Sequence, residues 1–92
     1  MKQYSGLKPA YTLALSRTAK RDLDHLPERD SKRVYGGLAH IQSNPLLGKK
    51  LSGKFSKLYS YRVWPYRIIY QPIKKILLVF VIRIGHRQGI YR

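Results

Sequence analysis

The last nine residues of the chain, IGHRQGIYR (84–92), bring together residue types that are common in active sites. His86, Arg87 and Tyr91 follow directly after a long apolar run. Histidine exchanges protons near neutral pH, so His86 is a candidate general acid or base. Whether this ending is a site or only the end of a small basic protein depends on the elements that position it.

A second segment, YSYRVWPYRIIYQ (59–71), combines four tyrosines and a tryptophan with two arginines. If it folds as a hairpin, Arg62 and Arg67 lie across from each other on its open face. Such a cationic pair suits a phosphate group, and exposed aromatic rings beside it would stack on unpaired bases. The alternative is that the tyrosines pack the sheet against helices, which we expect for two or three of them.

The net charge is the strongest compositional feature. The chain has 19 Lys and Arg against 4 Asp and Glu, for a formal charge of +15. This charge predicts a polyanionic partner, either nucleic acid or an acidic protein, and a merely soluble basic surface is the alternative.

The acidic residues are confined to one short stretch of the chain. They are Asp22, Asp24, Glu28 and Asp30, and none follows from residue 31 to residue 92. A site in the C-terminal two-thirds is therefore expected to work without carboxylates. This argues against paired-carboxylate hydrolysis, carboxylate-bound magnesium and a Ser-His-Asp triad.

Length and composition predict one domain spanning residues 1–92, in the cytoplasm and without a membrane partner. The chain has no cysteine, which excludes disulfides, thiolate nucleophiles and Cys-ligated zinc. We expect neither a metal site nor a cofactor. The N-terminus lacks the apolar segment of a signal peptide, and the apolar run 76–82 is too short to span a bilayer.

The first half of the chain predicts a strand and two helices. The alternating residues 11–15 predict a strand, and Ser16 is the expected N-cap of a helix that ends near His25. Pro27 is expected at the first position of a second helix, which ends near residues 43–45. Val34, Leu38 and Ile41 mark the apolar stripe of this helix, and its two glycines, Gly36 and Gly37, are expected to allow close packing.

The second half predicts three strands after a basic, glycine-containing connection (44–55). Residues 58–63 and 66–71 flank a tight turn at Trp64-Pro65, and residues 76–84 read as a central strand buried on both faces. We expect Gly85 to bend the chain after this strand. The predicted fold class is α+β, with two N-terminal helices packed on one face of a small antiparallel sheet.

The segments YRVWPYRIIYQ and LLVFVIRIGHRQGIYR resemble the RelE/ParE toxin superfamily, and the GHR…Y ending resembles its RelE branch. The resemblance implies a ribosome-dependent endoribonuclease that cuts mRNA in the A site. It also implies a cognate antitoxin that is acidic where it wraps the toxin. The toxin would contact operator DNA only within the antitoxin complex.

The resemblance also implies roles for individual residues. Arg67 and Arg87 match the two arginines that hold the scissile phosphate, and Tyr91 matches the terminal aromatic residue that orients the nucleotide. His86 falls where some branches have a catalytic histidine and others a lysine. Four residues of the resemblance thus form the implied catalytic set.

Lys54, Lys57 and Arg62 are expected to hold the RNA or the ribosome. Ser60 departs from the family pattern, because the well-known member has a lysine of its basic site there. Attack by the RNA's own 2′-hydroxyl needs a proton acceptor, positive charge at the phosphorane and a proton donor, and none of these steps requires a metal. Two alternatives remain open: a non-enzymatic, ParE-like inhibitor of DNA gyrase, and an RNA-binding module without catalysis.

Overall fold

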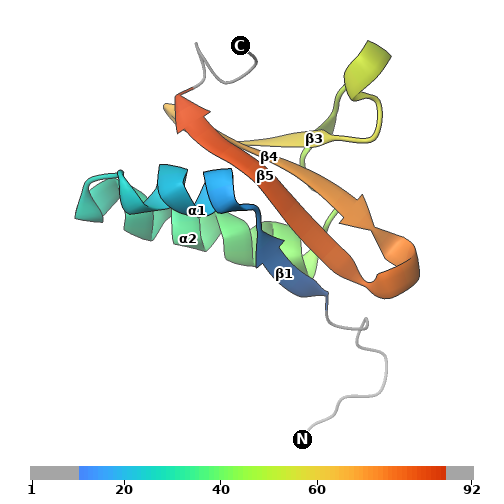
Figure 1. Ribbon diagram of the computed structural model, residues 1–92, viewed down its shortest axis with the longest axis horizontal. Coiled ribbons are helices and arrows are strands. Elements are labelled where there is room, and N and C mark those ends of the chain that lie inside the picture. Colours follow the sequence, from blue (N-terminus) through green and yellow to red (C-terminus); the bar gives the residue numbers. More distant parts are fainter. Residues whose placement is uncertain (1–10, 87–92) are drawn as a thin grey trace, which may run out of the picture.

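The computed structural model describes residues 11–86. The elements run β1 (Thr12–Leu15), α1 (Arg17–Asp24), α2 (Glu28–Ser43), β2 (Lys49–Lys50), the 3-10 turn η1 (Gly53–Phe55), β3 (Tyr59–Val63), β4 (Tyr66–Ile73), the 3-10 turn η2 (Lys74–Ile76) and β5 (Leu78–His86). The five strands form one sheet in the order β1-β5-β4-β3-β2, and both helices lie on the same side of it (Figure 1). The predicted α+β class is confirmed.

The first helix begins where the sequence signals predict, and the second begins one residue later. The Ser16 hydroxyl accepts a hydrogen bond from the Ala19 amide at 3.0 Å and donates one to the Ile82 carbonyl at 2.7 Å, so the cap also fastens α1 to β5. Pro27 is the N-cap of α2 rather than its first residue, because its extended backbone (φ −56°, ψ 151°) precedes the first helical turn. The prediction for Pro27 was therefore wrong by one position.

The core lies between the helices and one face of the sheet. The predicted stripe Val34, Leu38 and Ile41 is fully buried and belongs to one core cluster with residues of β4 and β5. Gly37 allows α2 to lie close to β3, since a Cβ there would stand 2.6 Å from Val63 Cγ2. The prediction of close packing holds for this glycine but not for Gly36, which faces open space.

The sheet is mostly antiparallel, but β1 pairs with β5 in parallel. The connection from β1 to β5 runs through α1, α2 and the strands β2, β3 and β4, and so is long enough for the crossover that a parallel pair requires. The prediction of an antiparallel sheet therefore holds for every strand pair except this one. Since β5 lies between β1 and β4, its predicted central place is confirmed.

Burial of β5 differs from the prediction. Val79, Val81 and Ile84 are buried, whereas the residues between them are only half-buried, because helices cover one face of the sheet and not the other. The strand also starts later and continues to His86, so Gly85 does not bend the chain out of the sheet.

The connections were predicted less well than the strands they join. The basic connection contains two short elements that were not predicted: β2, which pairs with β3, and the 3-10 turn η1, which lies between these two strands. Pro72 lies within β4, opposite Val79, and the turn to β5 follows at η2 and Leu77, whose φ is 51°. The tight turn at Trp64-Pro65 is confirmed and contains a cis peptide bond.

Candidate functional site

Arg62 and Arg67 are direct cross-strand partners in the β3–β4 hairpin. Alternation along the two strands places them on the face opposite the helices, because Tyr61 and Ile68 beside them contact the core. Residues paired in this way have Cβ atoms about 5 Å apart. The predicted cationic pair on the open face is therefore present.

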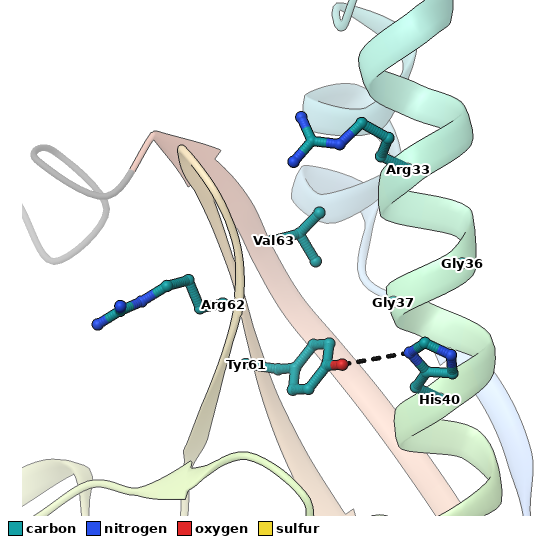
Figure 2. A pocket seen from close by; sticks show the side chains of 7 residues that line it. All are labelled: Arg33, Gly36, Gly37, His40, Tyr61, Arg62 and Val63. Carbon is teal, nitrogen blue, oxygen red and sulfur yellow. Dashed lines mark hydrogen bonds between the residues drawn. The ribbon is translucent and has the colours of Figure 1, made fainter.

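The two arginines differ in how firmly they are held. Arg62 is exposed, and its side chain points away from α2 in Figure 2. Arg67 is half-buried, and its guanidinium donates a hydrogen bond to the hydroxyl of Ser60 at 3.3 Å. Ser60 is itself only 3% exposed, so it forms a fixed support beneath Arg67.

No carboxylate neutralises this pair within residues 11–86. Three of the four acidic groups there form ion pairs elsewhere, Asp22 with Arg83, Glu28 with Lys32 and Asp30 with Arg33, and the fourth, Asp24, is exposed on α1. The partner of Arg67 on β5 is Gly85, which places no side chain over the open face at this point. Within residues 11–86 nothing therefore compensates the charge of these two guanidinium groups, which could bind an external anion.

His86 ends β5 as the register partner of Tyr66. Its ring contacts the Tyr66 ring edge to face, with 6.2 Å between centroids. The Tyr66 hydroxyl donates to Asp30 Oδ2 at 2.7 Å, and this hydrogen bond to a carboxylate is the main cause of a raised pKa of Tyr66. By strand alternation, His86 and Arg67 project from opposite faces at the same end of the sheet.

Two acidic residues of the helices reach the C-terminal strands. Besides the Asp30–Tyr66 bond, Asp22 Oδ2 accepts hydrogen bonds from Arg83 Nε at 3.0 Å and from the Ile84 amide at 2.9 Å. The expectation that a C-terminal site has no carboxylate nearby was therefore too broad. Separation along the sequence did not exclude contact, because α1 and α2 pack on the strands in question.

All four tyrosines of residues 59–71 lie on the helix side of the sheet, rather than two or three. Tyr70 is fully buried, and Tyr59, Tyr61 and Tyr66 pack against the same core. The Tyr70 hydroxyl donates to the Pro45 carbonyl at 2.8 Å and accepts from the Gly48 amide at 3.0 Å. These rings therefore do not form a base-stacking surface beside the two arginines.

The remaining candidates lie apart from this pair or outside the described residues. Lys54 and Lys57 are exposed in and after the 3-10 turn η1 that precedes β3, whereas Arg62 lies toward the other end of β3. Lys54 Nζ lies 5.4 Å from the centroid of the Phe55 ring. Arg87 and Tyr91 lie outside residues 11–86.

A groove of about 310 Å³ runs between α2 and β3 on the helix side (Figure 2). Arg33, Gly36, Gly37, His40, Tyr61, Arg62 and Val63 line it. The Tyr61 hydroxyl and His40 Nδ1 are 3.2 Å apart across the groove, as the dashed line in Figure 2 marks. Sequence reasoning missed this groove, and its only signal was the pair of glycines in α2.

Two further features concern the described part of the chain alone. It contains no cluster of three or more histidine and acidic side chains that could hold a metal ion. None of its helices combines the length and apolarity needed to cross a membrane.

Comparisons with known proteins agree with this fold. The family model described as "ParE toxin of type II toxin-antitoxin system, parDE" matches residues 13–91. The toxin RelG of Mycobacterium tuberculosis is 33% identical over 84 residues, which cover 89% of this chain and 97% of RelG.

Solved structures give the same result. The RelBE2 toxin–antitoxin complex of M. tuberculosis contains a chain with a TM-score of 0.79 and 31% identity, covering 86% of this chain and all of that one. The isolated E. coli toxin RelE has a TM-score of 0.75 and 26% identity, with 84% of each chain covered. Because the match extends over nearly the whole chain in sequence and fold, this protein belongs to the RelE/ParE superfamily of type II toxin–antitoxin toxins.

Proposed function

We propose that this toxin is a ribosome-dependent endoribonuclease that cuts mRNA in the A site. The observation that carries the proposal is the Arg62–Arg67 pair on the face that no helix covers, without a carboxylate partner among residues 11–86. Guanidinium groups in this arrangement suit the non-bridging oxygens of a phosphodiester. Similarity to RelG and RelE supports the RelE branch.

The proposed reaction is attack of an RNA 2′-hydroxyl on the adjacent phosphate. Arg67 and Arg87 stabilise the phosphorane, and Tyr91 orients the nucleotide. His86 carries a proton, either from the 2′-hydroxyl or to the leaving 5′-oxygen. Lys54, Lys57 and Arg62 hold the backbone of the mRNA or of ribosomal RNA.

Both faces of the sheet contribute at one end in this proposal. His86 is exposed at the end of β5, and its neighbour Gly85 lies opposite Arg67. An RNA strand that crosses this end of the sheet can therefore contact the guanidinium on one side and the imidazole on the other.

We also propose a cognate antitoxin as the partner that silences this activity. The M. tuberculosis relative was solved as a toxin–antitoxin complex, and a charge of +15 favours an acidic polypeptide. Operator DNA would be contacted only by that complex. The site of action is the cytoplasm, where translating ribosomes are found.

The second candidate is ParE-like inhibition of DNA gyrase without catalysis. The ParE description of the matching family model favours it. The two candidates make different predictions for cells that express the toxin. Primer extension shows sharp cuts within translated frames for the ribonuclease, whereas gyrase inhibition leaves mRNA intact and changes plasmid supercoiling.

The proton-transfer role is tested with His86→Gln, which keeps polarity and approximate size. We expect ribosome binding and thermal stability to be retained while single-turnover cleavage of A-site mRNA falls on the order of 10²–10⁴-fold. Near-normal cleavage by this variant would move the proton carrier to Lys54, Lys57 or Tyr91.

A further inference from the structure

A chain of contacts connects the first turn of α2 to the end of β5. The carboxylate of Asp30 accepts a 2.7 Å hydrogen bond from the Tyr66 hydroxyl, and the Tyr66 ring meets the His86 ring edge to face. We propose that Asp30 and Tyr66 are positioning residues that hold the imidazole of His86 for proton transfer. This proposal rests on the proposed function, because it assigns a purpose to the orientation of His86.

The far end of the chain of contacts is itself fixed. The Asp30 side chain is 23% exposed, lies in the first turn of α2 and has Arg33 Nη1 at 4.0 Å. Arg33 also donates a hydrogen bond to the Trp64 carbonyl in the β3–β4 turn. Asp30 and Arg33 thus join the helix to the hairpin at Tyr66 and at the turn that precedes it.

Tyr66 is held both by its backbone and by its hydroxyl group, and so can restrict the motion of the His86 ring that it contacts. Its backbone pairs with Val63 on β3 and with His86 on β5, and its hydroxyl is bound to α2. Its ring therefore has little freedom to turn. His86 is exposed and ends the strand, and within residues 11–86 the Tyr66 ring is the aromatic surface against which it rests.

Orientation of this kind has a large effect on proton transfer. A displacement of about 1 Å at a reacting group lowers rates by up to 10²-fold. An exposed histidine without support samples several rotamers, and only some of them direct a ring nitrogen toward the substrate. The Asp30–Tyr66 bond restricts this sampling without contacting the RNA itself.

The chain offers a matched control on the same face of the sheet. The Tyr61 hydroxyl contacts His40 Nδ1 at 3.2 Å, and these two rings also meet edge to face, at 6.3 Å. Like Tyr66, Tyr61 links the hairpin to α2 through its hydroxyl. Tyr61→Phe therefore removes a comparable bond without touching His86.

The experiment compares Tyr66→Leu, Tyr66→Phe, Asp30→Ala and the double variant Asp30→Ala/Tyr66→Phe with the control. Each full-length toxin is assayed for single-turnover cleavage on programmed ribosomes and, separately, for ribosome affinity. Two-dimensional NMR of the histidine rings reports the environment of His86 without any need for activity.

We expect Tyr66→Leu to shift the His86 ring signals and to slow cleavage about 10-fold or more at unchanged ribosome affinity. Tyr66→Phe and Asp30→Ala should slow cleavage less and to similar extents, and the double variant should be no slower than either. Such non-additivity is expected when two residues act through one shared bond. Tyr61→Phe should leave cleavage and the His86 signals unchanged.

Two results would overturn the proposal. One is wild-type cleavage by folded Tyr66→Phe and Asp30→Ala while His86→Gln is impaired, which would show that the bond has no role in positioning. The other is unchanged His86 ring signals in all Tyr66 variants. Normal cleavage by His86→Gln would instead contradict the proposed proton-transfer role of His86. This variant alone therefore separates a failure of that role from a failure of the positioning proposal.

Discussion

Replacing Arg67 with alanine tests the proposed phosphate site at low structural cost. Among residues 11–86 the Arg67 side chain has one hydrogen bond, to Ser60 at 3.3 Å, and no ion pair. Loss of a single long hydrogen bond of this kind costs about 0.5–1.5 kcal/mol of folding free energy. We therefore expect Arg67→Ala to remain folded and soluble.

The expected loss of activity is much larger. A guanidinium that neutralises the phosphorane acts like an oxyanion-hole donor, whose removal costs about 2–4 kcal/mol of transition-state stabilisation. At 1.36 kcal/mol per tenfold change in rate, this corresponds to a cleavage rate about 30- to 900-fold lower. The effect should appear in the rate at saturating ribosome concentration, because the interaction strengthens only as charge develops.

The assay is single-turnover cleavage of A-site mRNA, with circular dichroism and thermal unfolding measured in parallel. Arg62→Ala is the matched control, since Arg62 lies on the same face but is exposed and is assigned to backbone binding. It should weaken ribosome affinity more than it lowers the maximal rate. Folded Arg67→Ala that cleaves at the wild-type rate would refute the assignment of a phosphate to this pair.

Three further predictions follow from the packing and the charge. Gly37→Ala should lower the free energy of unfolding by about 1–3 kcal/mol, because its Cβ would stand 2.6 Å from Val63 Cγ2. Gly36 faces open space, so Gly36→Ala should raise the free energy of unfolding by up to about 1 kcal/mol, and equal effects of the two variants in urea titrations would contradict this. Burial raises the pKa of Tyr70 above its ordinary value of 10.0, so the folded state holds this proton more tightly and the free energy of unfolding falls as pH rises past 10. Tyr70→Phe should make this fall less steep, and an identical dependence of unfolding free energy on pH in the variant would contradict the prediction. Association with the antitoxin should slow as salt is raised, and a salt-independent association rate in stopped flow would show that charge does not guide the encounter.

The elements of the first half were predictable because their signals are local. Ser16 caps α1, and the spacing of Val34, Leu38 and Ile41 defines the buried face of α2. The parallel β1–β5 pair was not predictable in this way, because two helices and three other strands lie between its two strands in the sequence. β2 escaped notice since a two-residue strand has no periodicity.

The site was predictable where strand alternation determines it and less so where helices meet strands. The hairpin turn fixes the register that sets Arg62 across from Arg67. The contact of Asp30 with Tyr66 spans 36 positions and depends on how α2 lies over the sheet. The prediction that no carboxylate lies near the C-terminal strands therefore holds, within residues 11–86, for the open face of the sheet. It is wrong for the helix side, where Asp22 and Asp30 contact these strands.

Positive charge is concentrated on the open face of the hairpin, where Arg62 and Arg67 lie directly opposite each other. Like charges directly opposite each other on a sheet destabilise it, by a fraction of a kcal/mol to about 1 kcal/mol. Asp22 and Asp30 offset positive charge on Arg83 and Arg33, but both lie on the helix side. Asp22 and Asp30 thus join helices to strands, and Arg62 and Arg67 stay opposed and without an ion pair within residues 11–86. In the proposed function, a phosphate bound between these two guanidinium groups would offset their mutual repulsion.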